Sequence, residues 1–259
     1  MPNTIAAANA LMAKSLADIS RDPLQPKRGQ AMQLTIFGAT GKVGGHLVDQ
    51  ALKAGHTVTA VVRDPARLTP PAHGTPRVVT ADVMDPQAIA GAVAGADAVI
   101  SALGPPGRGP TSILTDSTPS IITAMNDAGT TRLITISGSM VDDTGDGPLL
   151  RYIAKPITRR ILKNACADMI SAENAIHASQ LDWTILRPPR LTDTAAAGKW
   201  RTALNRNVPH GPDRARAPTW VDRQPNAEDD QSVERKPAPA PGHLSQRRIV
   251  HQLYTDSRS

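Results

Sequence analysis

The sequence predicts an α/β protein whose sheet is mostly parallel and covered by helices on both faces. Short apolar runs alternate with segments of helical periodicity from residue 33 to about 190, and strands that alternate with helices form parallel sheets of this kind. The first apolar run is followed by three closely spaced glycines, which is typical of a tight turn between a strand and a helix. Short turns also follow the later runs, and in open α/β sheets such turns line one ligand-binding crevice.

The elements follow one another in a regular order. Gln33–Phe37 is a short apolar run that predicts the first strand, and residues 43–52 place apolar side chains at helical spacing. A second strand is predicted at Thr57–Val62, ahead of a short helix around residues 66–68. Later strands are predicted at residues 78–80, 98–101, 133–137 and 183–186, and later helices at 87–93, 113–128 and 151–179. The last helix is interrupted near Pro156, because proline cannot continue a helix.

Three glycines follow the first strand, and each has a physical role in binding a dinucleotide. Gly38 lets the chain turn tightly off the strand, Gly41 lets the backbone approach a pyrophosphate, and Gly44 lets the helix pack closely on the strand. The N-terminus of the following helix offers N–H groups and its positive dipole end to the phosphates. A glycine turn alone is a weak signal, but a strand precedes this one and a second strand arrives about twenty residues later. The sequence therefore predicts a dinucleotide site.

The end of the second strand favours NADP over NAD. NAD sites usually place an acidic side chain there for the ribose 2′-OH, whereas NADP sites use an arginine for the 2′-phosphate. Here Arg63 comes first, and Arg67 and Lys42 would complete a cationic pocket for the phosphate. Asp64 follows at once and leaves NAD as the alternative, although Asp64-Pro65 is also typical of the start of a short helix. Solvated surface cations are the other interpretation of these arginines.

Turns after the later strands supply further candidates. Asp82 and Val83 follow the third strand, where a carboxylate could accept a hydrogen bond from the adenine amino group; a turn or N-cap role for Asp82 is the alternative. The small residues of 101–104 would let the backbone lie against ribose and nicotinamide. Ser137 and Ser139 bring two hydroxyl groups after the fifth strand.

Two arginines follow the sixth strand. Arg187 and Arg190 flank a pair of prolines, which rigidify the loop. Two guanidinium groups so placed are able to clamp an anion. The loop is therefore a candidate part of the same crevice.

Composition excludes several classes of function. The 259 residues carry a formal net charge of +6 but only six aromatic side chains, too few to stack single-stranded bases, so no nucleic-acid partner is expected. No apolar run reaches the roughly eighteen residues of a membrane span, and no secretory segment is recognisable, so we expect no membrane and a cytoplasmic location. Cys166 is the only cysteine and the histidines lack metal-ligand spacing, so no metal is expected. A small buried side chain is a better interpretation of Cys166 than a nucleophile.

The chain divides into three unequal parts. Residues 1–31 are alanine-rich and then polar, and we expect an extension that is disordered or partly helical. Residues 32–204 hold the predicted α/β domain. Residues 205–259 are rich in proline and arginine without any period, so a largely disordered tail is expected. Their bias suggests a shifted reading frame that replaced the C-terminal lobe, and a natural basic tail for an anionic partner is the alternative.

Six motifs together resemble a known family. The resemblance over residues 32 to about 200 is carried by GATGKVG, VVRDPARL, ADVMD, DAVISALG, RLITISGS and LDWTILRPPRLTD. The chain resembles an atypical short-chain dehydrogenase/reductase of the NAD(P)H-binding type, similar to flavin reductases such as biliverdin-IX-beta reductase and to nitrogen-metabolite-repression regulators. This implies a doubly wound Rossmann sheet with a small C-terminal substrate lobe, which the altered tail would leave incomplete. It also implies a monomer or weak homodimer.

The resemblance assigns cofactor contacts by position. They are Gly38, Thr40, Gly41, Lys42 and Val43 for the pyrophosphate, Arg63 for the 2′-phosphate, Asp82 and Val83 for the adenine, and Ala102, Leu103 and Gly104 for the ribose. The expected cofactor is NADP, with NAD as the alternative.

The catalytic residues of the family transfer less directly. Carbonyl-reducing members use a tyrosine with a lysine four residues on, whereas Tyr152 and Lys155 are three apart and are better interpreted as a surface pair. Flavin-reductase-like members manage without that pair, and the positions that face their acceptor correspond to Ser137 and Arg190. Arg190 stands where those reductases have a histidine, and an arginine suits an acidic or phosphorylated acceptor better than proton donation.

These observations predict an NADPH-dependent oxidoreductase. Hydride would pass to a flavin, a quinone or a similar conjugated acceptor that Ser137 and Arg190 orient. The alternative is a non-catalytic NADP(H) sensor that acts through a protein partner, which the missing tyrosine–lysine couple favours.

Overall fold

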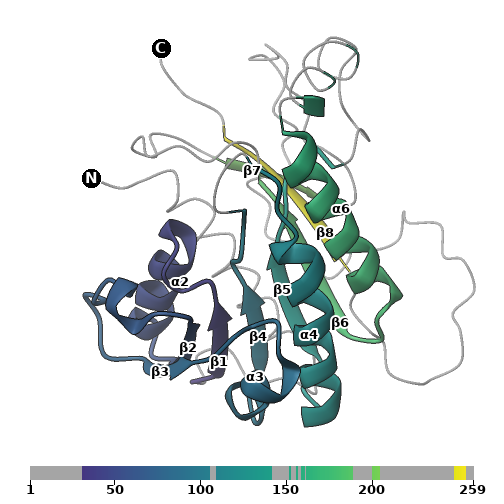
Figure 1. Cartoon of the computed structure of the whole chain (residues 1–259). Helices are drawn as coiled ribbons and strands as arrows, with labels where there is room; N and C mark the ends of the chain where they lie inside the picture. Colours follow the sequence, from purple (N-terminus) through teal and green to yellow (C-terminus); the bar gives the residue numbers. More distant parts are fainter. Residues whose placement is uncertain are drawn as a thin grey trace, which may run out of the picture.

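The computed structural model confirms the α/β fold, which is built around a single sheet (Figure 1). It describes residues 31–105, 109–141, 152, 156, 159–160, 162–188, 200–204 and 248–254. Within this part of the chain, eight strands form the sheet in the order β3-β2-β1-β4-β5-β6-β8-β7. The strands are β1 (Gln33–Phe37), β2 (Thr57–Val62), β3 (Arg77–Thr80), β4 (Ala98–Ser101), β5 (Arg132–Ile136), β6 (Asp182–Arg187), β7 (Trp200–Leu204) and β8 (Arg248–Tyr254).

The first four helices follow the predicted positions within one residue, whereas the last covers only the later part of the helix predicted at residues 151–179. The helices are α2 (Lys42–Lys53), the 3-10 helix η1 (Pro65–Arg67), α3 (Pro86–Val93), α4 (Ile113–Ala128) and α6 (Lys163–Ala178). Local chemistry explains several of their ends. The Asp85 side chain accepts a hydrogen bond from the Gln87 N–H at the start of α3, and α4 ends at Gly129, whose left-handed conformation (φ 69°) glycine adopts readily.

The strand order reverses beside β1. Phe37, at the end of β1, lies opposite Val61 of β2 on one side and Ser101 of β4 on the other, and both neighbours run parallel to β1. The chain therefore moves outward from β1 to β3 and then crosses back to β4. Loops after β1 and β4 diverge at this point, which is where open α/β sheets bind ligands.

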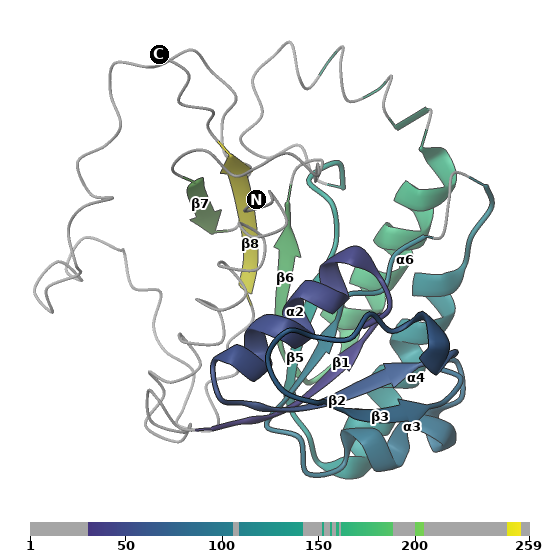
Figure 2. The ribbon, with the colours of Figure 1, turned by 90° about the vertical axis from the view of Figure 1, so that its left-hand side faces the viewer.

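Two apolar cores lie on opposite faces of the sheet. Leu34 and Ile36 of β1 pack with Val48 of α2, whereas Phe37 packs with Ile121 of α4 and with residues of α3 and α6. Successive side chains of a strand point to opposite faces, so this alternation places α2 on one face and α3, α4 and α6 on the other. Figure 2 shows α2 on the opposite side of the sheet from α4 and α6.

The segment after residue 204 contributes a strand that the sequence analysis did not predict. β8 pairs in parallel with β6, with Arg187 opposite His251, and β7 pairs antiparallel with β8. Ile249 and Val250 are β-branched residues suited to a strand, but the proline and arginine around them obscure this short signal. Residues 1–30, 205–247 and 255–259 lie outside the described residues, and the expectations for them stay predictions.

The described residues also bear on membrane spans and metal sites. No helix among them has both the length and the apolar character needed to cross a membrane. In the same part of the chain, histidine, cysteine, aspartate and glutamate side chains do not gather in groups of three or more that could hold a metal ion.

A histidine at the start of β2 should make stability depend on pH. The Met32 N–H donates to Nδ1 of His56 at 3.2 Å, and burial lowers the pKa of His56 below its ordinary value of 6.5. The unfolded chain therefore takes up the proton first, so this contribution to stability is complete above about pH 6.5 and shrinks as the pH falls below that value. We expect urea unfolding between pH 7.5 and 5.5 to show a smaller loss of stability in His56→Asn, which keeps an acceptor but does not titrate. Equal losses in the two proteins would contradict this role.

Candidate functional site

The candidate site lies where β1, β4, β5 and β6 end, which we call the C-terminal edge of the sheet. These strands are parallel neighbours, so the loops that follow them leave the sheet on the same side. Most of the sequence-predicted site residues belong to these loops or to the adjacent ends of β2 and β3. The topology therefore brings the predicted residues to one edge.

The glycine turn after β1 is packed too tightly for side chains at two positions. A Cβ on Gly44 would lie 2.1 Å from the carbonyl oxygen of Gly38, and a Cβ on Gly38 would lie 2.7 Å from the carbonyl carbon of Ala102. Gly38 also has φ +78°, a conformation that L side chains rarely adopt. The first turn of α2 thus rests directly on the turn, and the turn rests on the loop after β4.

The third glycine has a different environment. Gly41 is the N-cap of α2 with ordinary extended angles (φ −81°, ψ 161°), it is exposed, and a Cβ there would lie 3.2 Å from the Gly38 carbonyl oxygen. No side chain caps α2, and its first turn contains no acidic residue. The N–H groups and positive dipole end of this helix are therefore not paired with an acidic side chain of its own first turn, which suits a pyrophosphate.

The residues around Gly41 divide between surface and core. Lys42 is exposed and Thr40 is half-buried. Val43 is also half-buried, and its side chain packs against the core beneath α2. A phosphate contact at Val43 would thus use its backbone N–H.

Arginine and aspartate after β2 have separate roles. The Asp64 carboxylate accepts a hydrogen bond from the Ala66 N–H at 3.0 Å and caps η1, which is the helix-start interpretation of this residue. Arg63 and Arg67 are both exposed. The structure therefore leaves two cations at the end of β2 beside a carboxylate already used as a cap.

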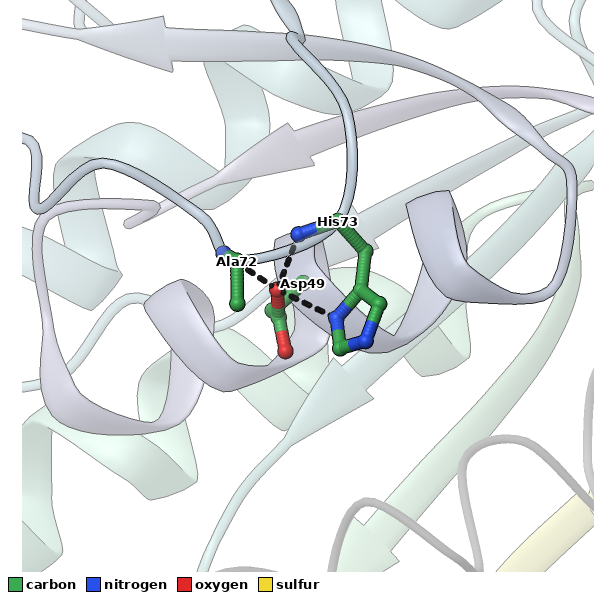
Figure 3. A network of polar contacts seen from close by, with 3 residues as sticks. All are labelled: Asp49, Ala72 and His73. Carbon is green, nitrogen blue, oxygen red and sulfur yellow. Dashed lines mark hydrogen bonds and ion pairs between the residues drawn. The ribbon is translucent and has the colours of Figure 1, made fainter.

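Asp49 holds the following loop against α2. Its Oδ1 accepts hydrogen bonds from the backbone N–H groups of Ala72 and His73 and lies 3.0 Å from Nδ1 of His73 (Figure 3). Burial opposes ionisation of Asp49, but the hydrogen bonds from His73 and Ala72 hold its pKa below the ordinary value. The loop between η1 and β3 is thus fastened to the helix that begins at the glycine turn.

The loops after β3 and β4 hold the residues that are predicted to contact the adenine and the ribose. Asp82 accepts a hydrogen bond from the Met84 N–H at 3.0 Å, which supports its turn role, and its adenine role stays a prediction. Val83 is buried in the core. The Ala102 N–H donates to the Phe37 carbonyl at 3.0 Å, and Gly104 is exposed with open space around the position of a Cβ.

Ser137 carries a buried hydroxyl group that lacks a hydrogen bond to any described residue. Its backbone N–H donates to the Leu186 carbonyl at 2.8 Å, which fixes Ser137 beside the end of β6. Leaving a buried hydroxyl unpaired costs about 1 to 3 kcal/mol. Because Ser137 directly follows β5, a ligand bound at the C-terminal edge of the sheet would be a suitable partner for it.

The predicted anion clamp after β6 is corrected by the structure. Arg187 is buried, and its Nε and Nη2 donate to the two carboxylate oxygens of Glu173 on α6. An arginine engaged in this bidentate, buried pair is not available to a ligand. Arg190, the other member of the clamp and a predicted acceptor contact, lies outside the described residues.

Other candidates agree with their non-catalytic interpretations. The Tyr152 residue is 70% exposed, as expected of a surface tyrosine, and Lys155 lies outside the described residues. Cys166 is buried in α6, where burial raises the pKa of its thiol although the charge of Arg159 opposes this. A cysteine in this state is a poor nucleophile.

Sequence reasoning missed two acidic residues of α6. Asp168 and Glu173 are buried together with Ala172 and Ile176 on the inner side of this helix. The sequence does contain a signal for such residues: an acidic residue on the apolar face of a predicted helix indicates a buried partner, because a carboxylate is rarely buried without one. Both residues support loops of the site.

A doubly wound sheet with a glycine turn, an uncapped helix N-terminus and arginines after β2 defines a dinucleotide-binding α/β protein. Comparison with known proteins agrees. The model of the NAD(P)H-binding family matches residues 38–218, and the chain belongs to this family. It therefore carries an NAD(P)H-binding domain on an oxidoreductase-like fold.

Individual relatives extend this comparison. The chain is 26% identical over 165 residues to the uncharacterized protein YwnB of Bacillus subtilis, which covers 63% of this chain and 75% of YwnB. The structure of ChuY, named an anaerobilin reductase of Escherichia coli O157:H7, shares the fold with a TM-score of 0.58 at 24% identity, covering 88% of this chain and 99% of ChuY. A short-chain dehydrogenase/reductase from Veillonella parvula, solved in complex with NADP, has a TM-score of 0.57 at 20% identity, covering 68% of this chain and 77% of that protein.

Gly41, the N-cap of α2, and Gly45, in the first turns of this helix, allow a matched test of the pyrophosphate position. We expect Gly41→Ala to weaken NADP binding about tenfold or more, because its methyl group would face the phosphates, equivalent to about 1.4 kcal/mol. The loss of folding stability should be about 1 kcal/mol or less, since alanine is a poor N-cap but needs no strained angles here. Calorimetric titration and thermal unfolding measure the two effects.

Gly45→Ala is the control for this test. A Cβ on Gly45 would lie 3.5 Å from the Ala39 carbonyl oxygen, an ordinary contact, and alanine is favoured over glycine within a helix by about 1 kcal/mol. This variant should be at least as stable as the natural protein and bind NADP as well. Equal binding by both variants would show that Gly41 does not face the phosphates.

Proposed function

We propose that the protein is an NADPH-dependent reductase of a flavin, a quinone or a similar flat, conjugated acceptor. The observation that carries the proposal is the buried, unpaired hydroxyl of Ser137 at the C-terminal edge of the sheet. The NAD(P)H-binding family and the shared fold of a protein named as a reductase support the reaction class.

When bound, the cofactor supplies a hydride from C4 of its nicotinamide, and the acceptor takes up hydride and a proton from solvent. The chain's own residues would bind the cofactor and orient it and the acceptor. The β1 turn and the N-terminus of α2 would hold the pyrophosphate, and Arg63 the 2′-phosphate. Ala102, Leu103 and Gly104, which are small or half-buried, would lie beside the ribose. Ser137 would donate a hydrogen bond to the group at the reacting end, or accept one from it.

Such a reaction does not require the tyrosine–lysine couple of carbonyl reductases. A conjugated acceptor spreads the incoming charge over its own ring system, so no positioned acid need protonate an alkoxide. The exposed position of Tyr152 agrees with this chemistry. Arg190 remains part of the proposal as a group that would attract an acidic or phosphorylated acceptor.

The exposure of Tyr152 also favours a second candidate, an NADP(H) sensor that acts through a protein partner. The sensor would bind the cofactor at the same residues and reduce nothing. NADPH oxidation followed at 340 nm with flavin and quinone acceptors, beside calorimetric titration of NADP and NAD, separates the two candidates. Tight binding without turnover of any acceptor would favour the sensor.

Ser137→Ala tests the reactive end of the site. We expect kcat/KM with the best acceptor to fall about tenfold or more, which corresponds to the loss of one hydrogen bond worth about 1.4 kcal/mol. Stability should not fall, because the removed hydroxyl is buried and unpaired. Ser120→Ala is the matched control, since its hydroxyl is likewise buried and unpaired but belongs to α4. Equal activity of the two variants would remove Ser137 from the site.

Arg63→Ala tests the choice of cofactor. Charge-assisted hydrogen bonds contribute about 1.5 to 3 kcal/mol, so NADPH binding should weaken about 10- to 100-fold while NADH binding changes little. Arg77→Ala removes another exposed arginine, from the start of β3, and should leave both affinities unchanged. Parallel losses for NADPH and NADH would contradict recognition of the 2′-phosphate by Arg63.

A further inference from the structure

Helix α6 carries a carboxylate whose surroundings differ from those of an ordinary ion pair. Asp168 is 2% exposed. Burial of a carboxylate is unfavourable unless hydrogen bonds replace those of water. The partners of Asp168 therefore show what this charge is used for.

Asp168 accepts four hydrogen bonds, which come from the first turn of α4 and from Thr111 just before it. Its Oδ1 accepts from the Thr115 N–H and the Thr115 hydroxyl, both at 2.7 Å. Its Oδ2 accepts from the Leu114 N–H at 3.1 Å and, more weakly, from the Thr111 hydroxyl at 3.4 Å. Asp168 thus caps a helix that begins more than fifty residues earlier in the chain.

Beside Asp168, the described chain around α4 supplies one weak contact of its own, from the Ile113 N–H to the Thr111 hydroxyl at 3.4 Å. Ser112, the N-cap residue of α4, makes no side-chain hydrogen bond to the backbone of the helix, and its hydroxyl donates to Asp116 instead. A carboxylate at a helix N-terminus is also favoured by the helix dipole. The position and direction of the start of α4 consequently depend on α6.

The connection from β4 to α4 is anchored at both ends. At its first end, the Ala102 N–H bonds to Phe37 and the backbone of Ala102 rests against Gly38. At its far end, Thr111 and the first turn of α4 bond to Asp168. Ala102–Gly104, expected beside the ribose and nicotinamide, lie between the cofactor turn and this anchor.

The next residue of α6 supports the neighbouring loop. The sulfur of Met169 lies 3.3 Å from where a Cβ on Gly138 would be, so its side chain packs directly on the residue after Ser137. Figure 1 shows α4 and α6 side by side over the same face of the sheet, and they pack against each other. Asp168 and Met169, which are consecutive residues of α6, therefore contact the start of α4 and the residue after Ser137, respectively.

We propose that Asp168 is a positioning residue for the nicotinamide half of the cofactor site. This rests on the proposed function in one respect, namely that the nicotinamide lies against the loops after β4 and β5. Asp168 touches neither cofactor nor acceptor. It acts by fixing the start of α4 and Thr111 just before it, whereas the adenosine half depends on the β1 turn and Arg63.

This role is tested by comparing the binding of the whole cofactor with the binding of a ligand that carries only its adenosine half. In Asp168→Asn, an amide group faces backbone N–H donors, so the start of α4 should shift. We expect NADPH binding to weaken about tenfold and kcat to fall by a similar factor or more, because small displacements of reacting groups are costly. Binding of 2′,5′-ADP, which carries only the adenosine half, should change less than about twofold.

Two further variants keep the test independent of folding. Thr115→Val removes one donor to Asp168 while keeping the backbone contacts and the side-chain shape. It should lower the affinity for NADPH relative to that for 2′,5′-ADP, as Asp168→Asn does, but by a smaller factor. Ile176→Val, in the core beneath α6, should lower the melting temperature without altering the ratio of NADPH to 2′,5′-ADP affinity.

The role is overturned if Asp168→Asn and Thr115→Val weaken NADPH and 2′,5′-ADP equally, or weaken neither. Failure of the proposed reductase function has a different signature. In that case the natural protein binds NADPH but reduces no acceptor, and the affinity ratio of the variants still decides the role of Asp168.

Discussion

The close contact between Gly38 and Gly44 is the constraint on which the site depends. A Cβ at residue 44 would lie 2.1 Å from the Gly38 carbonyl oxygen, so the two backbone segments can approach this closely only when residue 44 has no side chain. The same turn rests on the backbone of Ala102 on its other side. The N-terminus of α2 and the loop after β4 are therefore held in a fixed relation by steric contact, before any ligand arrives. A site formed in this way loses little entropy on binding.

Buried charges on α6 supply the second constraint, and they act over long range. Glu173 pairs with Arg187 at the end of β6, and Asp168 bonds to the start of α4. Buried pairs of this kind are weak evidence for stability, because the desolvation of each ion offsets much of the attraction. They do restrict geometry, since a charge moved off its partners would be left buried and unpaired. The end of β6 and the start of α4, which are far apart in the sequence, thereby take fixed positions relative to α6.

The division between local and long-range contacts explains what the sequence could predict. Apolar periodicity placed the strands from β1 to β6 and the helices, and the turn chemistry of Asp64 and Asp82 was recognised because their hydrogen bonds span two residues. The pairing of Arg187 was missed because Glu173 lies on another element. Asp168 was missed because the helix it caps lies on a distant segment.

The strand β8 belongs to the same group of missed features. Its register against β6, with Arg187 opposite His251, joins the end of the chain to the middle of the sequence. Propensity within a short segment is a weak signal when the flanking residues are prolines and arginines. Pairing with β6 decides the structure there, because the backbone groups of β6 on that side need partners.

The two halves of the site should therefore respond differently to sequence change. Residues that would select the cofactor, such as Arg63, are exposed and take part in no core packing, so their replacement can alter specificity at small cost in stability. The proposed reacting end lies beside strand ends that buried groups hold in place, including Arg187, which pairs with Glu173 of α6 and lies opposite His251 of β8. A change there alters packing and chemistry together. Sequence changes that alter the acceptor are accordingly expected at the residues beyond Pro188, which follow this anchored strand end, rather than in the strand itself.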